Sequence, residues 1–185
     1  MSGLPQNGMP KAGVIAAVSL FVADQVSKAI VVGPLGIDRL GQYREIVSFF
    51  DLRFVPNIGI SLGLLQANSD TTRWALVALT AVIAIGVAIW MTRERNRYDQ
   101  MALGLVLGGA LGNILDRIRF GYVVDFADFH IGNWRPFLVF NLADAAITIG
   151  VIILLVRALL IRDTDKTNSS DVQDAGKAPV ENSNA

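Results

Sequence analysis

Four apolar stretches, each about as long as a bilayer is thick, constrain this chain more than any other feature of its sequence. A helix needs about 20 apolar residues to cross the hydrocarbon core of a membrane. The stretches that meet this length lie at about 12–32, 73–91, 100–118 and 137–159. The composition agrees, because 52% of the residues are hydrophobic and only 17% are charged. We therefore expect an all-α integral membrane protein with four transmembrane helices.

Two of the stretches carry signals beyond their length. The first is longer than the core of a signal peptide, contains Asp24 and Lys28, and is followed by no small-residue cleavage site, so we expect it to be retained. The third contains Gly104, Gly108 and Gly112, a ridge of small residues that lets a neighbouring helix approach closely.

Basic residues in the connecting loops predict the orientation of the helices. Three arginines crowd the short loop 92–99, whereas the basic residues of loop 33–72 are spread among acids. Loops rich in basic residues tend to stay in the cytoplasm. We therefore expect both termini to be cytoplasmic and loops 33–72 and 119–136 to lie outside.

The first outer loop carries a secondary-structure signal of its own. Residues 46–55 mix β-branched and aromatic side chains with partial alternation, and Gly/Pro-rich stretches flank them, a pattern typical of short strands. We expect a small extracytoplasmic β-sheet on the outer membrane face. The membrane domain would span 1–162. Residues 163–185, which are rich in Asp, Ser and Asn, are expected to form a disordered cytoplasmic tail.

The absence of cysteine narrows the chemistry that the chain can perform. Without a thiol there is no cysteine nucleophile, no thiolate zinc site and no disulfide. The single histidine, His130, cannot supply a two-histidine zinc motif. A formal net charge of zero argues against nucleic-acid binding, because no basic surface would neutralise phosphates. Carboxylates, lysines and hydroxyls remain as the groups for hydrolytic chemistry.

Polar residues of three helices converge on one level of the membrane in the predicted topology. This level lies in the outer half of the bundle and contains Asp24 and Lys28 from the first helix, Asn113, Asp116 and Arg117 from the third, and Asn141 and Asp144 from the fourth. We expect Asp125 to enter the same level from the loop before the fourth helix. The second helix contributes no interior charge, so a shared polar site just below the outer surface follows.

Spacing separates the paired acids from the unpaired ones. Asp24 and Lys28 are an i,i+4 pair in the favourable order, which is more typical of a structural ion pair than of a catalyst. Asp116 has Arg117 and Arg119 beside it, either of which could reach it, and would serve as an interhelical strut.

Asp125 and Asp144, by contrast, have no basic residue among their neighbours. A carboxylate in a membrane helix is costly and by default marks a working site. Two such groups held together tend to share one proton, so that one can take a proton from water and the other can polarise a scissile carbonyl. A buried packing role for Asp144 is the alternative. Asp128 is the nearest rival to Asp125, although we expect it to be a solvated loop residue and His130 an interfacial one.

Two other functions fit parts of this pattern. A proton- or ion-coupled membrane transporter also carries intramembrane carboxylates, but it usually has more spans and access from both sides, whereas the inner half of these helices is dry. A Ser-Lys membrane peptidase would pair Lys28 with a serine, and only Ser61 could approach it from the loop. A non-enzymatic assembly factor would leave the unpaired aspartates unexplained.

Five sequence blocks resemble the lipoprotein signal peptidases, also called signal peptidase II or prolipoprotein signal peptidase. The blocks are DQVSK (24–28), NIGISLG (57–63), GNILDR (112–117), GYVVDF (121–126) and FNLAD (140–144). They follow one another in family order and at family spacing over about 12–160, and together they are highly specific. Ser61 and Leu62 depart from the family, which often has Ala and Phe there.

The resemblance implies an aspartic endopeptidase of the bacterial inner membrane that cleaves prolipoproteins just before a diacylglyceryl-modified cysteine. By motif position, Asp125 and Asp144 would be the catalytic pair. The positions that would support this pair or contact substrate are Asp24, Lys28, Asn57, Gly59, Gly109, Asn113, Asp116, Arg117, Asn141 and Ala143. The family implies no metal or organic cofactor, and globomycin is its inhibitor. We expect a monomer surrounded by membrane lipid, with its site near the periplasmic face.

Overall fold

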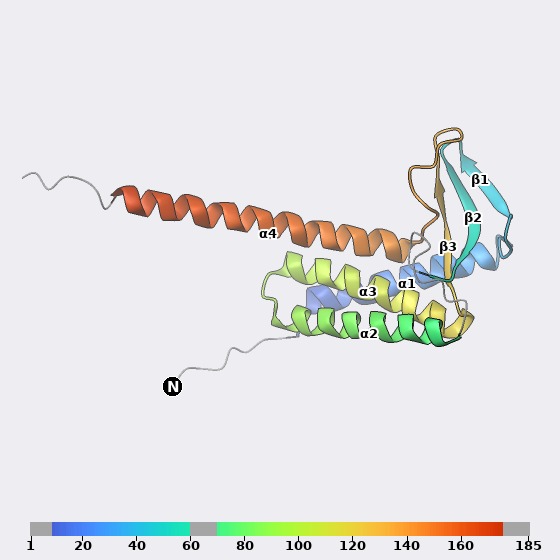
Figure 1. Cartoon of the computed structure of the whole chain (residues 1–185), viewed down its shortest axis with the longest axis horizontal. Coiled ribbons are helices and arrows are strands. Elements are labelled where there is room, and N and C mark those ends of the chain that lie inside the picture. The colour runs from blue at the N-terminus through green and yellow to red at the C-terminus, as the bar shows by residue number, and fades with distance from the viewer. Residues whose placement is uncertain (1–8, 60–69, 176–185) are drawn as a thin grey trace, which may run out of the picture.

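The computed structural model describes residues 9–59 and 70–175 and consists of a helical bundle with a small sheet at one end (Figure 1). The elements in chain order are α1 (Lys11–Val32), β1 (Tyr43–Val47), β2 (Phe50–Asn57), α2 (Asp70–Arg93), α3 (Arg97–Phe120), β3 (Val123–Phe129) and α4 (Leu142–Ala175). Within the described residues, α1, α2, α3 and the Leu142–Leu160 part of α4 are long and apolar enough to cross a membrane. The four predicted spans are therefore confirmed.

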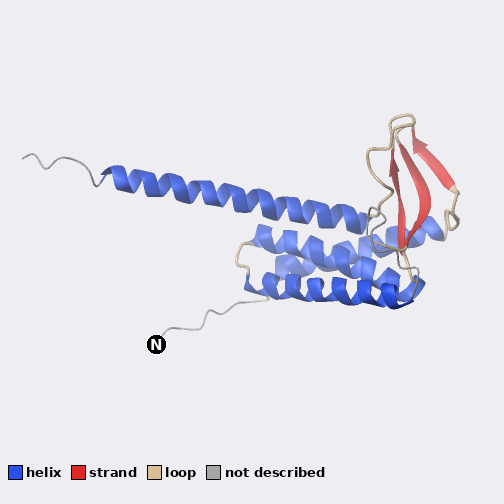
Figure 2. Cartoon of the chain, in the orientation of Figure 1, coloured by secondary structure: helices blue, strands red, loops and turns tan. Residues whose placement is uncertain are grey.

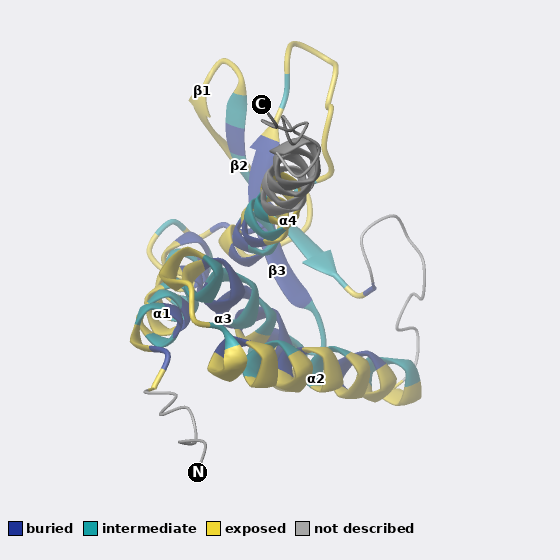
Figure 3. Ribbon diagram, turned by 90° about the vertical axis from the view of Figure 1, so that its left-hand side faces the viewer, coloured by how far each residue is buried: buried dark blue, intermediate teal, exposed yellow. Residues whose placement is uncertain are grey.

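Helix α3 is the centre of the bundle and contacts α1, α2 and α4 (Figure 3). Its glycines permit this. A Cβ at Gly104 or Gly108 would collide with the backbone of α1, and one at Gly109 would lie 2.7 Å from the carbonyl oxygen of Ala143 in α4. The predicted ridge of small residues is thus a close-packing surface. It brings the polar side chains of three helices within hydrogen-bonding distance of one another.

The sheet is antiparallel, with strand order β1-β2-β3 (Figure 2). Strands β1 and β2 fall where the sequence predicts them, around 46–55. Strand β3 lies in what we expected to be an outer loop, and Asp125 therefore enters the site from a strand. Six consecutive residues of β3, Val123–Asp128, are buried, so the sequence does not show the alternation that marks a half-exposed strand.

Helix α4 differs from its predicted bounds at both ends. It begins at Leu142 instead of 137, because Phe140 is held in extended form by paired backbone hydrogen bonds to Ala127. It continues to Ala175, past residue 162, where we expected the membrane domain to end; that the tail is disordered stays a prediction. No Gly or Pro stands between 161 and 175 to end a helix that the apolar span has begun, and the next is Gly176.

Candidate active site

The first turn of α4 holds Asp144 through a reciprocal pair of hydrogen bonds. The backbone N–H of Asp144 donates to Oδ1 of Asn141 (3.0 Å), and the backbone N–H of Asn141 donates to Oδ2 of Asp144 (3.4 Å). This is a capping box, in which the residue before the helix and the third helical residue satisfy each other's free N–H groups. The same contacts place the Asp144 carboxylate at the positive end of the helix dipole.

Asp125 reaches the same place from β3. Gly121 ends α3 in the left-handed conformation (φ 85°), which turns the chain sharply into the strand. The Asp125 side chain is 2% exposed and accepts hydrogen bonds from the amides of Asn57 (2.9 Å) and Asn141 (2.6 Å). Strand β3, strand β2 and the start of α4 therefore fix this carboxylate together.

Two asparagine side chains join the carboxylates. The amide of Asn141 donates to Asp125 and to Oδ1 of Asn113 (3.2 Å), and the amide of Asn113 donates to Asp144 (2.9 Å). Because Oδ1 of Asn113 also accepts from Lys28 (3.2 Å), its NH₂ group must face Asp144. Among the described residues, no basic side chain forms an ion pair with Asp125 or Asp144.

This environment changes the acidity of Asp125. Burial, followed by the nearby charge of Asp144, raises the pKa of Asp125 from 3.8 to about 7. Hydrogen bonds from Asn57 and Asn141 and the charge of Lys28 oppose that rise without cancelling it. At neutral pH this carboxyl can therefore give or take a proton, which general acid–base chemistry requires.

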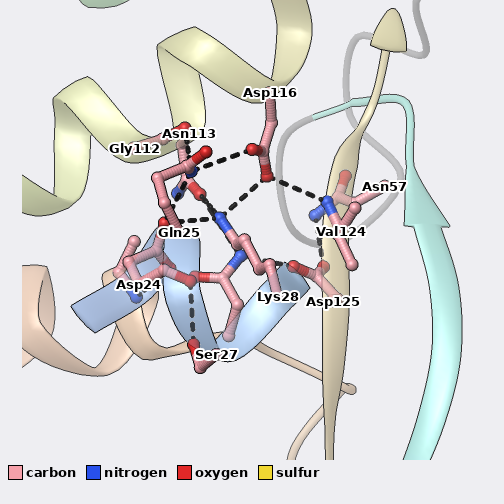
Figure 4. Close-up of polar contacts among 12 residues, drawn as sticks. Asp24, Gln25, Ser27, Lys28, Asn57, Gly112, Asn113, Asp116, Val124 and Asp125 are labelled. Carbon is pink, nitrogen blue, oxygen red and sulfur yellow. Dashed lines mark hydrogen bonds and ion pairs between the residues drawn. The ribbon is translucent and has the colours of Figure 1, made fainter. Parts of the chain in front are cut away.

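A buried ion cluster of Asp24, Lys28 and Asp116, which we call the Lys28 cluster, adjoins the site through the contact of Lys28 with Asn113 (Figure 4). The ammonium of Lys28 lies 2.8 Å from an oxygen of each acid, and all three residues are at most 4% exposed. The predicted i,i+4 pair is confirmed. The expected partner of Asp116 is wrong, because it pairs with Lys28 across the α1–α3 contact and not with Arg117 or Arg119.

The Lys28 cluster also ties the elements of the site together. Asp116 accepts the backbone N–H of Val124 in β3 (3.2 Å), and Asp24 accepts that of Ala143 in α4 (3.1 Å). Gln25 donates to Asp116 (3.0 Å), a contact that sequence reasoning missed. Its signal was present, since an amide inside an apolar span usually bonds a neighbouring helix.

The geometry does not favour a serine–lysine pair. The ammonium of Lys28 donates hydrogen bonds to Asp24 and Asn113 and forms an ion pair with Asp116, so it is fully occupied by these groups. The hydroxyl of Ser27 donates to the backbone oxygen of Asp24 (2.8 Å). Ser61, the serine that could approach from the loop, lies outside the described residues.

Arg117 and Gly59 complete the site. The Arg117 guanidinium donates to the carbonyl oxygen of Gly59 (2.9 Å), and the N–H of Gly59 donates to Oδ1 of Asn57 (3.1 Å). The segment after β2 is thereby fixed between Asp125 and Arg117. Arg117 forms no ion pair with a carboxylate of the described chain.

Comparison with known proteins assigns this site to a family. The sequence model of the family described as Signal peptidase (SPase) II matches residues 16–160, which include every site residue above. The chain belongs to the signal peptidase II family. It is therefore a membrane-embedded peptidase, and family membership disfavours the transporter alternative.

Curated relatives extend this likeness over most of the chain. The lipoprotein signal peptidases of Sphingopyxis alaskensis and Rhizorhabdus wittichii are each 58% identical over 149 residues, covering 80% of this chain and 86% of each relative. That of Nitrobacter hamburgensis is 42% identical over 153 residues, covering 81% of this chain and 93% of the relative.

Two solved structures described as bacterial membrane enzymes share the fold. One has a TM-score of 0.70 at 30% identity and covers 84% of this chain and 91% of its own. The other has a TM-score of 0.68 at 31% identity and covers 80% and 93%.

In this member of the signal peptidase II family, Gly109 of α3 and Ala143 of α4 lie where these two helices pack against each other beside the site. Ala143 is completely buried, and Gly109 packs against its carbonyl oxygen. Both residues bring α3 and α4 close enough for Asn113 to reach Asp144. Neither has a polar side chain. Gly109 acts through packing, and Ala143 acts through packing and through its backbone N–H, which donates to Asp24.

Asp128, the rival of Asp125, has a different environment from the one expected. It is fully buried and not a solvated loop residue, because β3 places it opposite Asp51 and within 3.0 Å of Arg53. Arg135 binds it from the other side at 3.1 Å. His130 follows the strand and lies 3.3 Å from Asp51. A carboxylate held by two arginines is a structural group of the sheet.

Proposed function

We propose that this signal peptidase II family member is an intramembrane aspartic endopeptidase in which Asp125 and Asp144 form the catalytic pair. The main support for the proposal is that the side chains of Asn113 and Asn141 connect the carboxylates of Asp144 and Asp125 by hydrogen bonds. Neither carboxylate forms an ion pair with a basic side chain of the described residues. The other two acids beside the site, Asp24 and Asp116, are each paired with Lys28. Among the acids of the described residues that line the site, Asp125 and Asp144 are the two without an ion pair.

The pair acts on water and on the peptide carbonyl in turn. With a pKa of about 7, Asp125 exchanges a proton near neutral pH, so one carboxyl of the pair can be protonated while the other is ionised. The ionised member takes a proton from a water molecule as its oxygen attacks the carbonyl carbon. The protonated member gives its proton to the carbonyl oxygen. When the C–N bond breaks, the departing nitrogen receives a proton from the pair.

Arg117 is the best placed donor for the oxygen on which negative charge develops. The amides of Asn57 and Asn113 already donate to Asp125 and Asp144. Arg117 uses one guanidinium N–H on the Gly59 carbonyl and has further N–H groups to offer. A cation at this position stabilises the oxyanion more than the ground-state carbonyl.

The substrate that fits is a prolipoprotein whose cysteine carries a diacylglyceryl group. The relatives that cover most of this chain are lipoprotein signal peptidases. The site lies at the end of the membrane spans, under the sheet. A lipid anchor would hold the scissile bond, just before the modified cysteine, at that level. Globomycin-type compounds would compete for the same place.

The orientation follows from the arginine-rich connection between α2 and α3. It is at the end of the bundle opposite the sheet (Figure 1). If basic loops stay in the cytoplasm, the sheet and the site face the periplasm, and both termini lie in the cytoplasm of a bacterial inner-membrane protein.

Cleavage of a diacylglyceryl-modified prolipoprotein by the purified protein in detergent tests the proposal. Asp125→Asn and Asp144→Asn should each abolish cleavage, and a metal chelator should have no effect. Asp38→Asn is the matched control, because Asp38 lies in the connection between α1 and β1 with its side chain 45% exposed. Cleavage that persists in either site variant, with thermal unfolding unchanged, would rule the pair out.

A further inference from the structure

Large apolar side chains are exposed at the tip of the sheet. The segment between β3 and α4 carries Ile131 (68% exposed), Trp134 (63%), Phe137 (65%) and Leu138 (61%). Phe49, in the turn between β1 and β2, is 54% exposed and adjoins them, because its carbonyl oxygen accepts the N–H of His130 (3.0 Å). We call these five residues the tip patch.

The tip patch is held in place by its surroundings. Ile131 and Trp134 exchange two backbone hydrogen bonds of 2.8 and 3.1 Å. Arg135 binds both oxygens of buried Asp128, and the rings of Phe129 and Phe140 stack with centroids 6.0 Å apart. Exposed apolar groups that are fixed this firmly mark a contact surface.

The position of the segment indicates what it contacts. Figures 1 and 2 show that it runs along the side of the sheet that faces the helices, and that the sheet extends sideways past the start of α4. The apolar span of α4 begins at Leu142. Leu138 precedes it by four residues, which reach at most about 14 Å. Leu138 is therefore close to the plane where α4 enters the bilayer, and the rest of the segment continues from it along the same side of the sheet.

We propose that the tip patch is an interfacial anchor that inserts into the phospholipid surface beside the bundle. A tryptophan such as Trp134 next to the end of a span is typical of the membrane interface. The anchor is separate from the catalytic site, since Phe129, where the strand ends, is four residues along β3 from Asp125, a distance of about 13 Å. Because β3 carries both, the anchor fixes the depth of Asp125 relative to the lipid.

The depth of Trp134 in a bilayer tests the proposal directly. The chain has three tryptophans, so Trp74→Phe and Trp90→Phe together leave Trp134 as the only reporter. The protein is reconstituted in phosphatidylcholine–phosphatidylglycerol vesicles whose acyl chains carry bromine near the headgroup or near the chain end. We expect stronger quenching by the shallow bromines than by the deep ones, and shielding from iodide in the water.

Two variants of the same reporter protein sharpen the test. Phe137→Ser with Leu138→Ser should shift Trp134 emission to the red and reduce shallow quenching. Leu40→Ser is the matched control. Leu40 is also an exposed leucine (73%), and it lies in the connection between α1 and β1, on the side of the sheet away from α4 (Figure 1). Its replacement should change neither the emission of Trp134 nor the quenching by shallow bromines.

Two results would overturn the anchor. Full access of iodide to Trp134 in vesicles, with no quenching by either lipid, would place the tip patch in water. Shielding that disappears as the protein is diluted with lipid would show that a second copy of the chain covers it instead.

Discussion

Replacing Lys28 with methionine should destabilise the protein far more than replacing either of its acidic partners. The Lys28 cluster holds two carboxylates and one ammonium, each at most 4% exposed, with N–O distances of 2.8 Å. Lys28→Met keeps the length of the side chain but leaves two buried carboxylates without their cation. Breaking a buried pair in this way costs about 3–5 kcal/mol. For a chain of this size that lowers the melting temperature by roughly 10 °C.

The charge of the cluster predicts the opposite behaviour for Asp116→Asn. This change takes the net charge of the cluster from −1 to zero, leaves Asp24 paired with Lys28, and should cost only about 1–3 kcal/mol, the value of an altered buried hydrogen bond. The double variant Lys28→Met with Asp116→Asn keeps one buried carboxylate, that of Asp24, instead of two. It should therefore be more stable than Lys28→Met alone, with a coupling free energy of about 1–3 kcal/mol between the two substitutions. Thermal unfolding in detergent measures all three. Additive losses, or equal losses for the two single variants, would refute the reasoning from charge.

Three further predictions concern the site itself. Because the pKa of Asp125 is raised from 3.8 to about 7, the folded state holds a proton between these pH values that the unfolded state releases. The free energy of unfolding should therefore fall as pH rises from about 4 to 7. Chemical denaturation at several pH values measures this slope, which should be weaker in Asp125→Asn. For the same reason kcat/KM for prolipoprotein should decline above about pH 7 as the pair loses its shared proton, and a flat alkaline limb would contradict the pair. Gly109→Ala should cost about 1–3 kcal/mol and most of the activity, since its Cβ meets a backbone oxygen at 2.7 Å, whereas Gly86→Ala, with no atom within 4 Å, should be silent in unfolding and cleavage assays.

The sequence predicted which polar residues meet in the bundle better than it predicted the elements that carry them. A single polar residue inside an apolar span is unusual. Each of Asp24, Lys28, Asn113 and Asp144 could therefore be recognised as a candidate site residue without knowing its partners. Their convergence followed from the topology alone. The glycine ridge of α3 was equally visible, because close approach of helices requires small residues at a fixed spacing.

Contacts between residues on different helices were harder to predict than the identity of the buried polar residues. Asp116 has two arginines nearby in sequence, yet its partner is Lys28, from a helix whose facing surface depends on the packing of α1 against α3. Gln25 was overlooked for the same reason. Strand β3 was missed because burial of both its faces removes the period-2 pattern by which strands are recognised.

The start of α4 could have been predicted, and its position bears on how the site works. Asn141 and Asp144 have the spacing of a capping box, which sets the first helical residue at Leu142. The packing role for Asp144 and the catalytic one are therefore not alternatives. Its Oδ2 accepts the backbone N–H of Asn141, and its Oδ1 accepts the amide of Asn113. The oxygen of the Asn141 side chain caps the helix while its nitrogen holds Asp125. The contacts that begin the helix thus also fix the distance between the two carboxylates, so loosening the cap should impair cleavage before it unfolds the bundle.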